Sequence, residues 1–321
     1  MRILITGAAG MIGRKLTARL VADGMLRKEQ IVSIHLHDIV AFEAPDAPFD
    51  ITVLAGDLAS EGVAGALVAG RPDVIFHLAG VVSGEAETDF DKGYRANLDG
   101  TRALFDAVRK ANGYVPRLVY TSSIAVFGAP FPETIGDDFA PVPLTSYGTQ
   151  KLVGELLLND YTRRGFMDGV GLRLPTICVR PGKPNLAASG FFSSIIREPL
   201  AGKEAVLPVS RNIVHTHASP RSAVGFLLHA AALAGDAIGP RRNITLPSVA
   251  VSVAGQIEAL REIAGDETFR LIREERDPAI EAIVNFWPTR FDAARARKLG
   301  FVAETDFAEI IRAHIEDELG G

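Results

Sequence analysis

The stretch that decides the fold is MRILITGAAGMIGRKLTARL, residues 1–20. Residues 2–6 are mostly apolar and partly β-branched, which predicts a buried strand. Gly7, Gly10 and Gly13 then follow at a spacing of three before an amphipathic run. In a strand–turn–helix unit the first glycine allows the bend, the second lets a pyrophosphate approach the backbone and the third lets the helix pack on the strand. The stretch predicts a dinucleotide at the helix N-terminus, with a glycine-rich turn that binds nothing as the alternative.

Composition bounds the class of protein. The 321 residues are 47% hydrophobic and 23% charged, enough for a sizeable core in one large domain or two intimate ones. The net charge is −5 and there is no run of lysine or arginine, so we expect neither nucleic acid nor a membrane surface as a partner. Cys178 is the only cysteine, which excludes an internal disulfide. With no room for a signal peptide before the first strand and no apolar stretch of roughly 20 residues, a cytoplasmic location is expected.

A carboxylate after the second predicted strand indicates which dinucleotide binds. The strand over 31–37 delivers Asp38 at its carboxyl end. A carboxylate there can accept both hydroxyls of the adenosine ribose and repels a 2′-phosphate, which favours NAD over NADP. Asp57 follows a third strand over 51–54. It is expected either to bind the adenine amino group or to cap a helix that begins near Ser60.

The remaining strands of the first half complete one repeating pattern. A fourth strand over 73–77 runs into small residues that suit close passage of the backbone over a cofactor. A helix is expected over 87–111, and a fifth strand over 117–120 ends at a run of hydroxyl side chains that includes Ser123. The alternation of strands and helices predicts a doubly wound parallel sheet, whose ligands bind beyond the carboxyl ends of the strands.

A tyrosine and a lysine one helical turn apart form the candidate catalytic pair. Tyr147 and Lys151 lie at i and i+4 in a predicted helix that continues to Tyr161, so they share one face. A tyrosine has an ordinary pKa near 10 and is a poor base at neutral pH. A neighbouring ammonium favours the phenolate and makes Tyr147 usable as a general base. Taken alone, the pair is also common in proteins that do no such chemistry.

The glycine turn, Asp38, Ser123 and the Tyr147-Gly-Thr-Gln-Lys151 segment occur in order at the spacing of a known family. The whole chain resembles the extended short-chain dehydrogenase/reductases, a group of NAD-dependent epimerases and dehydratases. The resemblance implies a Rossmann-type α/β fold with a smaller, discontinuous substrate-binding lobe. The expected domains are residues 1–175 for NAD, with part of 213–245 returning to them, and residues 176–212 and 246–321 for the lobe.

The resemblance also implies roles for individual residues. Tyr147 would be the catalytic base, Lys151 would hold the nicotinamide ribose and lower the pKa of the tyrosine, and Ser123 would orient the reacting hydroxyl. The implied NAD-binding residues are Gly7, Gly10, Met11, Ile12, Gly13, Asp38, Asp57, Leu58, Leu78, Ala79, Gly80, Asn97, Tyr147, Lys151, Pro175 and Thr176. The implied substrate-binding residues are Ser83, Ser123, Tyr147, Arg180, Lys183, Asn185 and Arg211.

The second half of the chain bears on the substrate. The loop over 179–185 holds two cations and an amide, groups that a small acid needs when its carboxylate leaves water. A solvated basic loop is the alternative. Where the family places acidic positions after an arginine for a nucleotide diphosphate, this chain has residues 217–219, His-Ala-Ser, which argues against a nucleotide sugar. His215 and His217 are expected on opposite sides of a strand, so no metal site is predicted.

The phrases over 81–87, 173–176, 180–185 and 196–200 resemble a branch of the family that oxidises C2 of a four-carbon sugar acid with NAD. The sequence therefore predicts an NAD-dependent dehydrogenase of a small sugar acid. A nucleotide-sugar 4-epimerase, which uses the same serine, tyrosine and lysine, is the alternative, and a non-catalytic NAD sensor is the third hypothesis. Helical faces over 87–111 and 147–164 resemble surfaces that form dimers in this family, so a homodimer is expected. Packing of the same apolar stripes against the sheet is the alternative.

Overall fold

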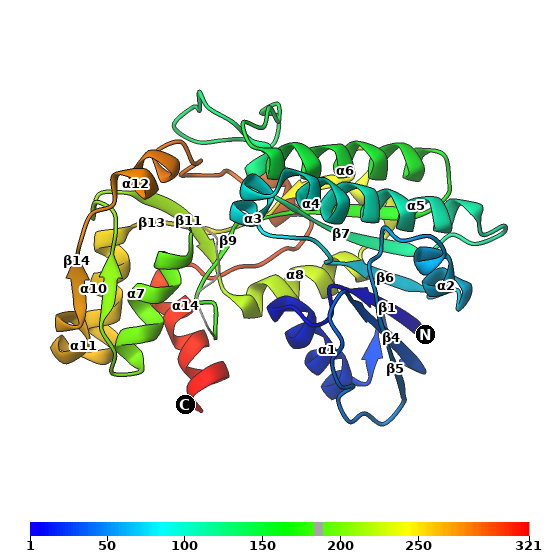
Figure 1. Cartoon of the computed structure of the whole chain (residues 1–321), viewed down its shortest axis with the longest axis horizontal. Helices are drawn as coiled ribbons and strands as arrows, with labels where there is room; N and C mark the ends of the chain where they lie inside the picture. The colour runs from blue at the N-terminus through cyan, green and yellow to red at the C-terminus, as the bar shows by residue number, and fades with distance from the viewer. Residues whose placement is uncertain (183–188, 321) are drawn as a thin grey trace. The chain divides into compact units, whose positions relative to one another are not determined.

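Figure 1 shows the computed structural model, which describes residues 1–182 and 189–320. The chain forms two compact units. The first unit comprises residues 1–126, 145–173 and 224–244, and the second comprises residues 127–144, 174–223 and 245–321.

A seven-stranded sheet forms the centre of the first unit, as the sequence predicted. Its order across the sheet is β12-β8-β7-β6-β1-β4-β5. The strands are β1 Arg2–Thr6, β4 Ser33–Asp38, β5 Asp50–Ala55, β6 Val74–His77, β7 Arg117–Ser123, β8 Asp168–Leu174 and β12 Asn243–Thr245. β1 pairs in parallel with β4 on one side and with β6 on the other. The chain therefore reverses its winding direction beside β1, and the carboxyl ends of β1 and β6 flank the point where such sheets bind ligands.

Burial on both faces explains why the run at the centre of the sheet forms a strand. Ile3, Leu4 and Ile5 of β1 are all 0% exposed, because both faces of the sheet are covered by helices. The last residue of β1, Thr6, lies in register with His37 of β4 and His77 of β6. These three residues lie near the carboxyl ends of their strands, at the edge of the sheet where the glycine turn begins.

Helices of the first unit cover both faces of this sheet (Figure 1). They are α1 Met11–Asp23, α2 Val63–Ala69, α3 Ser83–Thr88, α4 Phe90–Tyr94, α5 Gly100–Lys110, α6 Ser146–Arg163, α8 Pro220–Ala232 and α9 Gly235–Ile238. A buried core joins α2, α5 and α6 to the sheet through residues such as Leu67, Phe105, Leu118, Tyr120 and Leu158. The short hairpin strands β2 Met25–Leu26 and β3 Glu29–Gln30 follow α1.

The helix expected over 87–111 is broken into pieces. α3 ends at Thr88, and Asp89 leaves the helical region with φ −127° and ψ 88°. Its side chain then accepts a hydrogen bond from the backbone N–H of Lys92 and so starts α4. Between α4 and α5 the chain forms a π-helical turn, η1 Arg95–Asp99. Apolar periodicity predicted helix here correctly but did not reveal the break or the wider turn.

The second unit is built from small sheets and short helices around its own core. Its strands are β9 Thr176–Ile177, β10 Ala205–Leu207, β11 Val214–Ala218, β13 Val249–Ser252 and β14 Ile272–Glu274. Its helices are α7 Gly190–Leu200, α10 Val253–Ala264, α11 Asp266–Arg270, α12 Pro278–Val284, α13 Ala294–Lys298, α14 Phe307–His314 and the π turn η3 Ile315–Leu319. β11 pairs with β9 and β13, and Phe192, Ile195, Leu260 and Ile310 are among its fully buried residues.

One segment of the second unit lies within the range expected for the NAD domain. Residues 127–144 belong to the second unit although they precede α6, the helix of Tyr147 and Lys151. Of the range 213–245, residues 224–244 belong to the first unit, and β11 lies outside it. Within the described residues, no helix combines the length and the apolar character needed to cross a membrane. The assignment of cofactor to one unit and substrate to the other stays a prediction.

Candidate active site

The turn between β1 and α1 leaves no room for side chains at two of its glycines. Gly7 has a φ of +75°, and a Cβ there would lie 2.6 Å from the backbone nitrogen of Ala79. A Cβ at Gly13 would lie 2.7 Å from the Cα of Ala8. At Gly10, by contrast, the nearest heavy atom to such a Cβ is the Gly7 carbonyl oxygen at 3.3 Å. The first and third glycines are thus required by packing, while the second keeps the backbone open to a ligand.

The start of α1 fits a dinucleotide. Its N-cap is Gly10, so no side chain accepts hydrogen bonds from the first backbone N–H groups, which begin at Met11 and Ile12. Uncapped N–H groups and the positive end of the helix dipole favour a phosphate. Asp38 accepts one hydrogen bond at each carboxylate oxygen, from Ala9 N at 2.9 Å and from Val40 N at 3.3 Å. Each oxygen keeps further lone pairs for ribose hydroxyls, so the residues present fit NAD.

Asp57 already has two partners within the protein. Its Oδ1 accepts a hydrogen bond from the backbone N–H of Ala59 at 2.9 Å. Its Oδ2 pairs with Arg95 Nε at 2.5 Å. The carboxylate therefore caps the turn that leads to α2, which begins at Val63 rather than near Ser60. Its contact with adenine stays a prediction.

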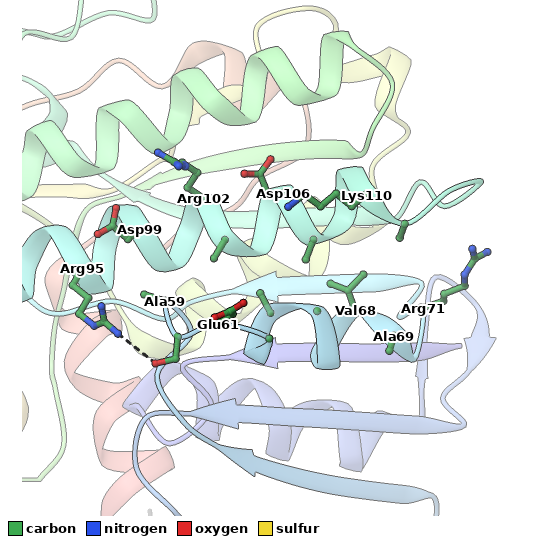
Figure 2. Close-up of a pocket in the computed structure, with 17 residues that line it drawn as sticks. Ala59, Glu61, Val68, Ala69, Arg71, Arg95, Asp99, Arg102, Asp106 and Lys110 are labelled. Carbon is green, nitrogen blue, oxygen red and sulfur yellow. Dashed lines mark hydrogen bonds between the residues drawn. The ribbon is translucent and has the colours of Figure 1, made fainter.

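A hollow of about 680 Å³ lies between α2 and α5 (Figure 2). Arg95 points across it toward Ser60, with 3.3 Å between Arg95 Nη2 and Ser60 Oγ. Small residues form much of its lining, among them Ala59, Gly62, Ala64, Gly65, Ala69, Ala103, Ala107 and Ala111. The residues that line it include neither Tyr147 nor Lys151, so it is not the predicted catalytic centre.

Lys151 is the electrostatic centre of the candidate site. Its side chain is 4% exposed, and its Nζ donates a hydrogen bond to the carbonyl oxygen of Thr121 at 3.0 Å. The Nζ also lies 5.7 Å from the centroid of the Tyr147 ring and 5.2 Å from that of Tyr120. Burial lowers the pKa of Lys151 to about 8, which leaves the ammonium charged at neutral pH. A cation held this close to Tyr147 favours its phenolate.

Ser123 is the last residue of β7 and lies in the same unit as Tyr147 and Lys151. Its Oγ accepts a hydrogen bond from the backbone N–H of Ala125 at 3.1 Å. That bond leaves the hydroxyl proton of Ser123 free to be donated to another oxygen. A serine with this arrangement can orient a substrate hydroxyl or carbonyl.

Asn97 joins the π turn to two other parts of the site. Its Oδ1 accepts from the backbone N–H of Val81 at 2.9 Å, and its Nδ2 donates to Gln150 Oε1 at 2.7 Å. A Cβ at Gly80 would lie 2.5 Å from Asn97 Oδ1 and 3.5 Å from Lys151 Nζ. π turns often present functional residues, and this one holds the loop after β6 against α6. The predicted asparagine thus has a structural role beside the lysine.

Two buried supporting residues were missed from the sequence. Gln150, 0% exposed, holds Asn97, and Glu155, 1% exposed, accepts a 2.6 Å hydrogen bond from Ser122 Oγ. Glu155 also forms an ion pair with Arg173, with 2.7 Å between Oε2 and Nη2. Both supporting residues lie on the face of α6 that Lys151 shares. The sequence signal that could have identified Gln150 and Glu155 is that both are polar residues on a helix face expected to be buried.

The predicted substrate residues are distributed over both units. Ser83 is the first residue of α3 in the first unit and is half-buried. In the second unit, Arg180 donates from Nε to the Ile177 carbonyl at 3.0 Å and from Nη2 to Ser189 Oγ at 2.9 Å. Lys183 and Asn185 lie outside the described residues.

Arg211 and Thr176 make contacts within the second unit. Arg211 Nε pairs with Glu274 Oε1 at 2.7 Å, so its charge is offset by a carboxylate. Thr176 Oγ1 is 2.7 Å from His215 Nε2, and Pro175 beside it is buried. Their predicted contacts with substrate and cofactor stay predictions.

The expectation that His215 and His217 lie on opposite sides of a strand is wrong. Their ring centroids are 5.3 Å apart, because side chains two residues apart on a strand share a face. Both rings pack against Phe192. Burial lowers the pKa of His215 to about 4, and it lowers the pKa of His217 as well, so both are neutral. Among the described residues, no group of three histidine, cysteine or acidic side chains could hold a metal ion.

Comparisons with known proteins agree with this arrangement. Residues 3–216 match the model of the NAD dependent epimerase/dehydratase family. The chain is 47% identical over 320 residues to a D-erythronate dehydrogenase of Cupriavidus necator, covering 99% of this chain and 98% of that one. It is 40% identical to a D-erythronate dehydrogenase of Haemophilus influenzae, covering 99% and 100%. The solved structure of a nucleoside-diphosphate-sugar epimerase from Agrobacterium tumefaciens matches with a TM-score of 0.97 and 61% identity, covering 100% and 95%.

The burial of Lys151 predicts a pH dependence of stability. Its pKa is about 8 in the folded chain and 10.5 ordinarily, so the unfolded chain binds more protons between these values. Below pH 8 the buried ammonium lowers the free energy of unfolding by its full amount. This loss disappears as the pH rises to 10.5. The free energy of unfolding relative to Lys151→Met should therefore rise by about 3 kcal/mol between pH 7 and pH 10.5. Urea unfolding at each pH measures this change in the free energy of unfolding. Replacement of the exposed Lys110 with methionine is the control. Parallel pH curves for wild type and Lys151→Met would contradict the assignment.

The position of Asp38 predicts the choice of dinucleotide. Replacing Asp38 with alanine removes a carboxylate that repels a 2′-phosphate, so the preference for NAD over NADP should fall at least about tenfold. Calorimetric titration with each dinucleotide measures both affinities. Asp46→Ala, which removes an exposed loop carboxylate, is the matched control and should change neither. An unaltered affinity ratio in Asp38→Ala would remove Asp38 from this role.

Proposed function

The chain belongs to the NAD-dependent epimerase/dehydratase family, and we propose that it is a dehydrogenase that oxidises the C2 hydroxyl of a small sugar acid. The proposed substrate is D-erythronate and the proposed product is 2-dehydro-D-erythronate. NAD, when bound, supplies the acceptor for the hydride from C2.

One observation carries the proposed chemistry: a buried ammonium 5.7 Å from the ring of a tyrosine one turn away on the same helix. The phenolate of Tyr147 takes the proton of the substrate hydroxyl, because Lys151 stabilises the negative oxygen. Ser123 donates its free hydroxyl proton to the same substrate oxygen and so orients it. With Tyr147, Lys151 and Ser123 in these roles, the reaction needs no other base.

Similarity over the whole chain supports the substrate. Two D-erythronate dehydrogenases match 99% of this chain at 47% and 40% identity. In the second unit Arg180 is a half-buried cation whose guanidinium is oriented by Ile177 and Ser189. An oriented guanidinium suits a carboxylate, and we propose Arg180, with Lys183 and Asn185, as its binding residues.

A nucleotide-sugar 4-epimerase is the second candidate. The observation in its favour is the 61% identity to the solved nucleoside-diphosphate-sugar epimerase of Agrobacterium tumefaciens. Against it, Arg211, the residue that would meet a diphosphate, is paired with Glu274 at 2.7 Å. At the position where the family places an acid, this chain has His217. Its side chain is 0% exposed and hydrogen-bonded to Gln256.

We also propose that the protein works in the cytoplasm as a homodimer. Support for the dimer comes from apolar side chains at the surface of the helices that resemble the dimer contacts of this family. Leu156 on α6 is 60% exposed and Phe90 on α4 is 57% exposed. Pairing with a second copy would remove this apolar surface from water.

A substrate panel tests the proposed activity. The protein should reduce NAD when it is given D-erythronate, measured as NADH absorbance against four- to six-carbon aldonates. The same preparation is incubated with UDP-glucose and UDP-galactose, and the products are separated. Turnover of D-erythronate with unchanged UDP-sugars supports the proposal. Interconversion of the UDP-sugars with no oxidation of any aldonate would establish the epimerase instead.

Replacing Tyr147 with phenylalanine tests the general base. Loss of the phenolate should lower kcat about a thousandfold and leave the affinity for NAD within about twofold, because the ring still fills its place. Tyr161→Phe is the matched control, since Tyr161 lies on the same helix but donates its hydroxyl to Asp106 at 2.8 Å. Substantial turnover in Tyr147→Phe would transfer the base role to another group.

A further inference from the structure

The segment that carries Ser83 is attached to the catalytic helix at both ends. At its start, the backbone N–H of Val81 is held by Asn97, which itself donates to Gln150 of α6. At its end, Glu87 of α3 extends its carboxylate to the first turn of α6. Residues 81–88 are therefore connected to the helix of Tyr147 and Lys151 by two polar contacts in the same unit. The Glu87 contact is separate from the Asn97 contact.

Glu87 binds backbone groups of the catalytic tyrosine and its neighbour. Its Oε1 accepts hydrogen bonds from Ser146 N at 2.6 Å and from Tyr147 N at 3.4 Å. Thr145, the N-cap, accepts from Gly148 N at 3.0 Å. The first three N–H groups of α6, which have no partner within a helix, are thus all bound by two side chains. A carboxylate at this place also interacts favourably with the positive end of the helix.

Tyr147 needs this support more than Lys151 does. Helix ends fray, and Tyr147 is only the second residue of α6 and is half-buried. Lys151 lies one turn further on and is buried, so packing holds it in place. The reacting oxygen of the proposed base therefore depends on the first turn remaining helical. A misplacement of about 1 Å at a reacting group can cost about a hundredfold in rate.

We propose that Glu87 is a positioning residue for Tyr147: its carboxylate fixes the first turn of α6 and so holds the phenol in place. The proposal rests on the proposed function of Tyr147 as the general base. Glu87 contacts the backbone of the base and not its reacting oxygen, so it acts through Tyr147. Its loss should affect the chemical step and spare the binding of NAD.

Three variants test the proposal. Glu87→Ala removes the acceptor, and Glu87→Gln keeps an acceptor oxygen while removing the charge. Glu85→Ala is the matched control, because Glu85 lies on the same helix but pairs with Lys92 at 2.5 Å. Amide hydrogen exchange of the peptide covering 145–150 should be about fivefold faster in Glu87→Ala and near the wild-type rate in the other two. This measurement needs no substrate.

The kinetic readout uses the aldonate that the wild type oxidises. In Glu87→Ala, kcat should fall about ten- to hundredfold with the KM for NAD within about twofold, and Glu87→Gln should recover most of kcat. Should Glu87→Ala not fold, Glu87→Asp, which is one methylene shorter, takes its place with the same expectations.

Three results would overturn the proposal. They are unchanged exchange at 145–150 in Glu87→Ala, a Glu87→Gln variant as slow as Glu87→Ala, and a loss of NAD affinity with kcat intact. If the wild type oxidises no aldonate, the proposed function fails, and the exchange experiment alone still decides whether Glu87 holds the first turn.

Discussion

The close approach of bare backbone at the first turn is the constraint on which the rest of the structure depends. A side chain at Gly7 would meet the backbone of Ala79, and one at Gly13 would meet Ala8. Because neither glycine has a side chain, α1 packs directly on the end of β1, and β6 ends beside the same turn. That contact places the uncapped N-terminus of α1 at the point where the sheet reverses its winding. Two other predicted cofactor residues meet this turn, since Asp38 accepts a hydrogen bond from Ala9 N and Ala79 packs against Gly7.

The central strands β1, β6 and β7 could be predicted from the sequence because each is a short run that is almost wholly buried. The expected strand over 31–37 is observed as β4, Ser33–Asp38, with a shift of two residues at its start. The helix over 87–111 could be predicted as helix but not in its details. Asp89 starts a new helix with its own side chain, and η1 widens one turn, and neither event changes the spacing of apolar residues enough to be detected.

The proximity of the candidate catalytic pair was predictable because i, i+4 spacing is local, and the structure places the ammonium of Lys151 near the ring of Tyr147. The groups that hold the pair were not predictable, since they act across the chain. Glu87 accepts hydrogen bonds from a helix 59 residues later in the chain, and Asn97 contacts Gln150 across 53 residues. Such contacts depend on the assembled fold and leave no periodic signal. In the second half of the chain, accordingly, the contacts of individual side chains could not be predicted from the sequence.

The π turn over 95–99 has a consequence for how relatives of this chain are compared and redesigned. A π turn holds about one residue more than an α turn, and one residue of an α-helix corresponds to about 100° of rotation. Removing a residue here would turn every side chain of α5 by about 100° relative to α4, carrying Leu104 and Phe105 off the sheet. A one-residue gap at this place in an alignment therefore separates two different helix registers, and Asn97 can be transferred only between chains that share the extra residue.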